Sequence, residues 1–233
     1  MTEGRTEEPE KGLLERNSRL KYLSNCFKQG LNDPGIIGYH GISLEVFDDI
    51  INNGKIKGGY GGHFQEEITR LSPQISIILK DTKQVATYHE EGWHPGDVPL
   101  GLATGYAKDQ AARHVIMKRA GLELGSHEFA SVSQEKHLQD LMVRRHLIKR
   151  QVLNKILSGV NRRHGRAGII LGIHRNILED FKLRPRTEVD EPGEVAVVCP
   201  EGIDYKYIIG IEPEGQVEWD YLVKLQKQAE RIK

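Results

Sequence analysis

The chain has 233 residues, and its 33 basic side chains balance its 33 acidic ones, so net charge favours no class of partner. Hydrophobic residues make up 38% of the sequence, which is enough for a packed core and excludes global disorder. Two cysteines, Cys26 and Cys199, are too few for a disulfide framework or a cysteine metal site. No apolar run approaches the roughly 20 residues that span a bilayer, so we expect a cytoplasmic protein without membrane contact.

The first part of the chain predicts two helices around a short strand. The expected elements are a disordered segment over 1–11, a helix over 12–30, a turn at 32–35, a strand over 36–40 and a helix over 44–53. Ser43 is expected to cap the second helix, because its hydroxyl can accept a hydrogen bond from a backbone N–H of the first turn. Gly54 is expected to end that helix.

The rest of the chain predicts helices first and strands later. The expected elements are a glycine-rich loop over 57–63, a strand over 74–79, a short helix from residue 81, a break over 92–99, helices over 103–120 and 134–158, strands over 167–173, 195–198 and 207–211, and a helix over 219–233. Together these elements predict an α+β domain over 36–233 with a helical insertion at about 92–165. Residues 1–35 precede it as a disordered segment and a helix.

Three side chains, those of Glu194, His40 and Tyr88, are candidates for a catalytic or ligand-binding role. Glu194 opens a strand, where a carboxylate can stabilise positive charge that develops on a ribose. His40 ends a buried strand and can donate a hydrogen bond to a hydroxyl, and Gly41 lets its backbone approach a planar amide. Tyr88 could stack on a flat heterocycle. Each has an ordinary alternative, namely a solvated acid at a strand end, a turn and a core tyrosine.

The order of these residues resembles a known family. The stretch from Gly38 to Ser43 (GYHGIS) resembles the Tyr-His-Gly-Thr opening of ADP-ribosyltransferases of the diphtheria-toxin and poly(ADP-ribose) polymerase class, which is known by a histidine–tyrosine–glutamate triad. Residues 75–88 (ISIILKDTKQVATY) look like the second strand and following helix of that class. Residues 194–211 (EVAVVCPEGIDYKYIIGI) are similar to the segment that starts at its catalytic glutamate.

The resemblance implies a fold, a co-substrate and a set of roles. It implies a split β-sheet core that binds NAD without a metal. His40 would bond the adenosine-side ribose, and the backbone of Gly41 would hold the nicotinamide carboxamide. Tyr88 would stack on the nicotinamide ring. Glu194 would bond the 2′-hydroxyl of the nicotinamide ribose and stabilise the oxocarbenium-like transition state.

Three further residues join the implied NAD site. Ser43 follows the His-Gly motif. Tyr60 lies in the glycine-rich 57–63 segment, which falls where the donor loop of the family covers NAD. Ile77 lies in the second strand, where the family often has an aromatic residue; Tyr60 is then the side chain that could supply the second wall of the nicotinamide pocket.

The acceptor and two rival functions stay open. Residues 136–186 hold thirteen Lys and Arg against three Asp and Glu, so this stretch could contact an acidic protein surface or a nucleic acid, or form a solvated helix face. We expect transfer of mono-ADP-ribose to such an acceptor. Arg163-His164-Gly165 resembles a motif of NAD-dependent RNA 2′-phosphotransferases, which lack the strand-mouth glutamate. A non-catalytic module that binds NAD or ADP-ribose is the other alternative.

Overall fold

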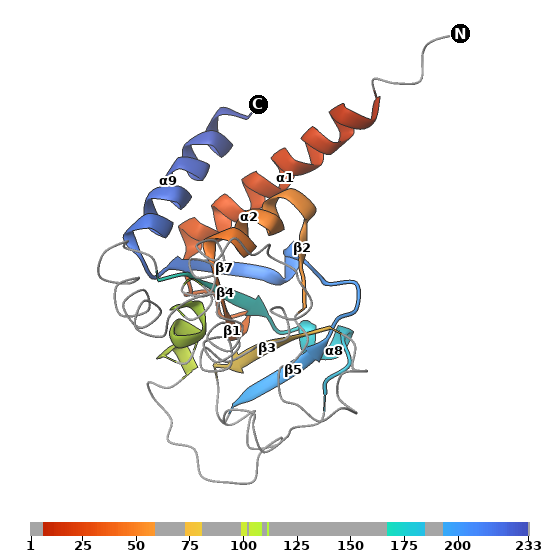
Figure 1. Ribbon diagram of the computed structural model, residues 1–233, viewed down its shortest axis with the longest axis vertical. Helices are drawn as coiled ribbons and strands as arrows, with labels where there is room; N and C mark the ends of the chain where they lie inside the picture. The colour runs from red at the N-terminus through yellow and green to blue at the C-terminus, as the bar shows by residue number, and fades with distance from the viewer. Residues whose placement is uncertain are drawn as a thin grey trace, which may run out of the picture.

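A five-stranded sheet forms the centre of the computed structural model, which describes residues 7–58, 73–80, 99–101, 103–108, 111, 167–184 and 193–232 (Figure 1). Its strands, in spatial order, are β5 (Glu194–Val198), β3 (Gln74–Leu79), β1 (Ile36–Ile42), β4 (Ile169–His174) and β7 (Ile208–Pro213). Every neighbouring pair is antiparallel. A two-stranded sheet joins β2 (Lys55–Ile56) to β6 (Ile203–Asp204). With the helices below, this confirms the predicted α+β class.

In the part of the chain that the structure describes, helical residues lie on both faces of this sheet. The long helices α1 (Glu7–Gln29), α2 (Leu44–Asn53) and α9 (Gln216–Arg231) lie together on one face (Figure 1). Short helices α8 (Ile177–Asp180) and η2 (Tyr205–Tyr207) lie between later strands. The described residues of the predicted insertion, 99–101, 103–108 and 111, are helical and pack on the other face. The remainder of that insertion lies outside the described residues.

The predicted ends of α2 are confirmed. Ser43 has extended backbone angles of φ −86° and ψ 165°, and its hydroxyl accepts a hydrogen bond from the N–H of Val46 at 3.3 Å. Gly54 adopts the left-handed region at φ 74°, and its N–H donates to the carbonyl of Ile50. Because only glycine takes that conformation without strain, the helix ends there.

Two predicted boundaries needed correction. Helix α1 begins at Glu7, so residues 7–11 are helical and not disordered as predicted. Strand β1 continues through Gly41 to Ile42, two residues beyond the predicted end. The later strands and the final helix lie within a few residues of their predicted positions.

The core lies mainly between the sheet and the three long helices. Isoleucines and leucines of β1, β3, β4 and β7, together with valines of β5, pack there against buried side chains of α1, α2 and α9, such as Leu23, Phe47 and Leu222. A smaller cluster on the other face joins Ile36, Tyr39, Ala103 and Ile170. We call these two groups the main core and the second cluster. The two faces of the sheet are therefore both covered, the second by backbone and small side chains.

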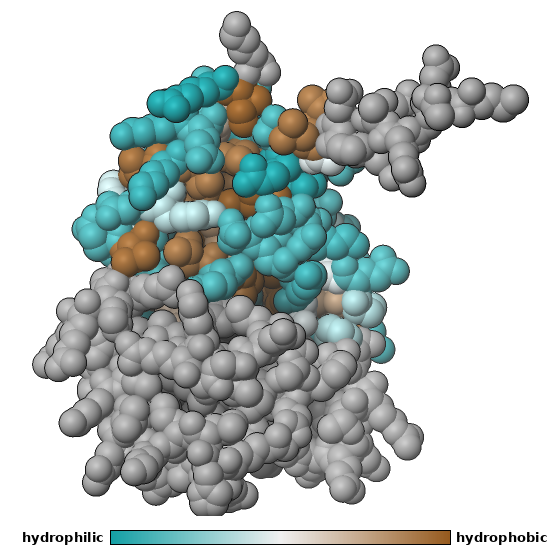
Figure 2. Space-filling model, turned by 45° about the horizontal axis from the view of Figure 1, so that its top comes forward, coloured by the Kyte–Doolittle hydropathy of each residue, from teal (hydrophilic) through white to brown (hydrophobic). Residues whose placement is uncertain are grey.

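The first and last helices are tied together. Phe27 and Trp219 make an edge-to-face ring contact with centroids 5.6 Å apart, and Lys28 pairs with Glu230 at 3.2 Å. Figure 2 looks onto this end of the molecule and shows hydrophobic atoms lying between hydrophilic flanks. In the part of the chain that the structure describes, no helix combines the length and the apolar character that crossing a membrane requires.

Candidate active site

Strand β1 sends alternate side chains to the two faces of the sheet from Gly38 onward, after an irregularity in its register with β4 between Ile36 and Gly38. Ile42 lies in the main core, whereas Tyr39 lies in the second cluster. His40 is registered opposite Leu171 of β4, a main-core residue. Cross-strand partners share a face, so the His40 side chain leaves the strand on the main-core side. The residue is only partly buried.

The pairing of β1 with β3 ends before His40, and we call the place where the two strands no longer pair the opening. These strands pair only at Gly38–Leu79 and Tyr39–Ile78, although both continue beyond those positions. Past that point the Nδ1 atom of His40 lies 2.7 Å from the carbonyl oxygen of Ser76 in β3. The imidazole thus bonds a main-chain carbonyl that would otherwise face the next ladder position of β1.

Because His40 bonds the carbonyl of Ser76, Gly41 does not pair with Ser76 in the ladder between β1 and β3. Lys80 donates its N–H to the carbonyl of Ile37, so Ile37 points its peptide groups toward β3. Because these directions alternate along an antiparallel strand, the N–H and C=O of Gly41 also point toward β3. A continued register would join Gly41 to Ser76, but the Ser76 carbonyl is bonded by His40 instead. The peptide groups of Gly41 therefore face the opening.

The environment of His40 favours its neutral form. Burial lowers the pKa of His40 below its ordinary value of 6.5, and the hydrogen bond to the Ser76 carbonyl partly opposes that shift. Because a carbonyl oxygen only accepts, Nδ1 must carry the proton. In the neutral ring Nε2 is then an acceptor. His40 can thus accept a hydrogen bond from a hydroxyl group near the opening, where the sequence led us to expect a donor.

Glu194 begins β5, on the far side of β3 from His40. It follows Gly193, which is buried at φ 77° and whose carbonyl accepts a hydrogen bond from the N–H of Leu79 at 2.9 Å. Glu194 itself is registered opposite Ile78 and is partly exposed. The hydroxyl of Tyr106 donates to its Oε2 at 3.3 Å. Ladder and hydrogen bond together hold the carboxylate at the mouth of the strand.

The register sets how His40 and Glu194 are related in space. Ile78 is opposite both Tyr39 and Glu194, so the Glu194 side chain lies on the face of the second cluster. His40 leaves β1 on the other face. One strand separates β1 from β5, which places the two backbones about 10 Å apart.

Ser43 and Ile77 are buried at structural positions. Ser43 has 0% exposure and caps α2 through its hydroxyl. Ile77 also has 0% exposure and packs in the main core. Neither side chain presents surface to a ligand in this conformation. Tyr60 and Tyr88 lie outside the described residues, as do residues 59–63 of the glycine-rich loop and most of the basic 136–186 stretch.

No family model, no curated protein and no solved structure matches the chain. Its function has to be argued from the site itself.

Both cysteines of the chain are buried. Burial raises the pKa of both Cys26 and Cys199 to about 11, so these thiols are protonated and poorly nucleophilic at neutral pH. Among the described side chains, no three of His, Cys, Asp or Glu are grouped so as to hold a metal ion.

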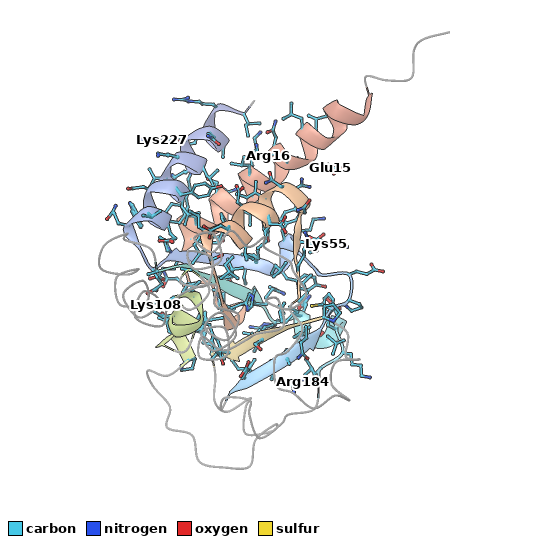
Figure 3. The ribbon with its side chains drawn as sticks, in the orientation of Figure 1. Glu15, Arg16, Lys55, Lys108, Arg184 and Lys227 are labelled. Carbon is cyan, nitrogen blue, oxygen red and sulfur yellow. The ribbon has the colours of Figure 1, made fainter. Side chains whose placement is uncertain are left out.

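Tyr106 is a site residue that the sequence analysis missed. The pattern that could have revealed it is Ala103, Ala107 and Ala111, which recur every four residues and are at most 1% exposed. Such a stripe predicts a helix in close contact with a neighbouring backbone. Figure 3 labels two cationic residues near this region, Lys108 on the same helical segment and Arg184 beside β5.

Proposed function

We propose that this protein is an NAD-dependent ADP-ribosyltransferase with a split-sheet catalytic core. It cleaves the bond between nicotinamide and ribose and passes mono-ADP-ribose to a macromolecular acceptor. The observation that carries the proposal is the opening between β1 and β3, where His40 bonds the Ser76 carbonyl and the peptide groups of Gly41 face the gap. The family resemblance of the three ordered sequence segments gives this opening its expected ligand.

The groups around the opening fit the two ends of NAD. A planar carboxamide offers one donor and one acceptor side by side, which matches the N–H and C=O of Gly41. A ribose hydroxyl can donate to Nε2 of neutral His40. The backbone N–H of Arg184 donates to the carbonyl of Ala196 at 2.8 Å, and Leu183 is registered opposite Val197, so Arg184 lies opposite Ala196, two residues along β5 from Glu194. Its guanidinium would add positive charge that suits a pyrophosphate. Tyr88 is assigned to stack on the nicotinamide ring by resemblance alone.

The proposed reaction is a substitution at the anomeric carbon of the nicotinamide ribose. The bond from this carbon to the ring nitrogen breaks, and nicotinamide leaves with the bonding electron pair. Positive charge develops on the ribose, and the carboxylate of Glu194 stabilises it while bonding the 2′-hydroxyl. A nucleophile of the acceptor then forms the new bond to the same carbon and loses its proton. Glu194 acts electrostatically and forms no covalent intermediate.

Release of nicotinamide from NAD tests the proposal. Glu194→Gln keeps the size and polarity of the side chain but removes its charge, so we expect release to fall about 100-fold or more. Unchanged NAD affinity would show that the loss belongs to the transition state and not to binding. Glu201→Gln, a substitution of an exposed glutamate in the turn after β5, is the matched control and should leave the rate unchanged.

The same assay separates the alternative functions. NAD binding with no nicotinamide release under any condition would point to a non-catalytic module and would contradict the proposal. Release that requires a 2′-phosphorylated RNA would point to the phosphotransferase. Incubation with labelled NAD and a cell lysate, with and without nuclease, then locates the label on protein or on nucleic acid.

A further inference from the structure

The helical segment around residues 103–108 approaches the sheet more closely than side chains would allow. A Cβ atom on Gly41 would lie 2.2 Å from the carbonyl oxygen of Ala103 and 2.5 Å from the nitrogen of Ala107. A Cβ atom on Gly168 would lie 2.5 Å from the carbonyl oxygen of Ala107. Both alanines have 0% exposure. Helix backbone therefore rests directly on strand backbone, which fixes the height of this helical segment above β1.

This contact sets the position of Tyr106. Ala103 and Ala107 face the sheet one turn apart, and Tyr106 lies three residues after the first, on the adjoining side of the same segment. From there its hydroxyl reaches Oε2 of Glu194 at 3.3 Å. The helical segment thus touches Gly41 through its backbone and Glu194 through one side chain. It links two elements of the proposed active site that belong to different strands.

We propose that Tyr106 is a positioning residue for Glu194. The ladder with β3 fixes the backbone of Glu194, and the orientation of its carboxylate depends on the contacts of the side chain. The Tyr106 hydroxyl restricts that orientation by donating to one oxygen of the carboxylate. The 3.3 Å separation is long for such a bond, as expected before substrate closes an active site. This inference rests on the proposed function.

The experiment is a double-mutant cycle between Tyr106→Phe and Glu194→Gln, with nicotinamide release as the measurement. Tyr106→Phe keeps the ring and removes the hydroxyl, so kcat should fall about tenfold while the KM for NAD stays within about twofold. In the Glu194→Gln background, Tyr106→Phe should lower kcat by less than about twofold, because the carboxylate that the hydroxyl orients has already been removed. A structural role for Tyr106 would cost the same factor in both backgrounds.

The matched control is Tyr221→Phe. The Tyr221 hydroxyl also donates to a carboxylate, that of Asp48 at 2.6 Å, but it lies with α2 and α9 on the opposite face of the sheet. We expect no change in kcat from this control. A loss in Tyr106→Phe that is equal in both backgrounds, or no loss at all, would overturn the inference while leaving the proposed function intact. An inactive wild-type protein would instead remove the proposed function, and this inference with it.

Discussion

His40 combines a structural task with a proposed binding task through its two ring nitrogens. Nδ1 donates to the Ser76 carbonyl and so ends the ladder between β1 and β3. Nε2 then has the acceptor character that a ribose hydroxyl requires. Because one side chain opens the sheet and also lines the opening, substitutions at His40 should affect both folding stability and NAD affinity. The two effects can be separated by pH.

We expect the pH dependence of stability to change in His40→Asn. Burial lowers the pKa of His40 in the folded protein, so below pH 6.5 the unfolded chain takes up a proton that the folded chain resists. This term lowers the free energy of unfolding as pH falls through 6.5, and it levels off below the folded pKa. Asparagine keeps a donor close to the position of Nδ1 but does not titrate. Urea unfolding at pH 5 and pH 8 should show a smaller acid loss for the variant.

The same variant tests the binding task at pH 8, where titration plays no part. It lacks an acceptor at the position of Nε2, so we expect NAD affinity to fall about tenfold. An equal acid loss in both proteins would contradict the burial of His40, and an unchanged affinity would remove His40 from the NAD site. The nine other histidines are common to both proteins, so the difference between the two isolates His40.

At the scale of elements, the site depends on how the 103–108 segment meets β1. Glycine at position 41 serves twice, because its peptide groups face the opening while its missing side chain admits the helix backbone. A motif that reads as a ligand-binding glycine in the sequence is therefore also a packing glycine. The packing contribution can be measured separately, by the effect of a substitution at Gly41 on stability.

Gly41→Ala should destabilise the protein. The added methyl group would meet backbone atoms of Ala103 and Ala107 that cannot rotate away, so we expect the free energy of unfolding to fall by about 1–3 kcal/mol. Gly105→Ala is the matched control, because nothing lies within 4 Å of its Cβ position on the same helical segment. This control should be neutral or more stable by up to about 1 kcal/mol. Equal stabilities of the two variants in urea would contradict the close packing.

Most of the helices and strands that the structure describes were predicted from the sequence. The prediction succeeded where residues within one turn of each other determine the local structure. Ser43 and Gly54 predicted both ends of α2, because a cap and a left-handed glycine act within one turn. The opening beside His40 was not predictable from local pattern, since it depends on the register of β1 against β3. The contact between Tyr106 and Glu194 joins residues 88 apart in the chain, and no periodicity encodes such a pairing.

At the scale of the whole molecule, the first and last helices complete one layer. Helices α1 and α9 pack against each other and against β7, with α2 beside them. Arg19 of α1 adds a bond across this layer, since its guanidinium donates to the carbonyls of Ile51 and Asn52 at 2.7 Å each. It thereby satisfies carbonyl groups at the end of α2 that have no intrahelical partner. Residues from both ends of the chain are thus needed to cover the main core.

The substitution Leu222→Ala should show how much the packing of α9 contributes to stability. Leu222 is 3% exposed and packs in the main core beneath α1, so we expect its truncation to cost about 2–5 kcal/mol of unfolding free energy. Leu13→Ala removes the same atoms from a side chain of α1 that is 57% exposed, and should cost less than about 0.5 kcal/mol. Thermal or urea unfolding compares the two. A small effect at Leu222 would mean that α9 is not integral to the core.

The direction in which α1 and α9 leave the sheet has a practical consequence for handling the protein. In Figure 1 the start of α1 and the end of α9 lie at the same end of the molecule, whereas β3 and β5 lie toward the opposite end. A resin tether or a fusion partner joined through either helix would extend away from the edge that carries Glu194. Immobilised protein could therefore be screened against bulky acceptors, protein or nucleic acid, with the anchor on the far side from the site.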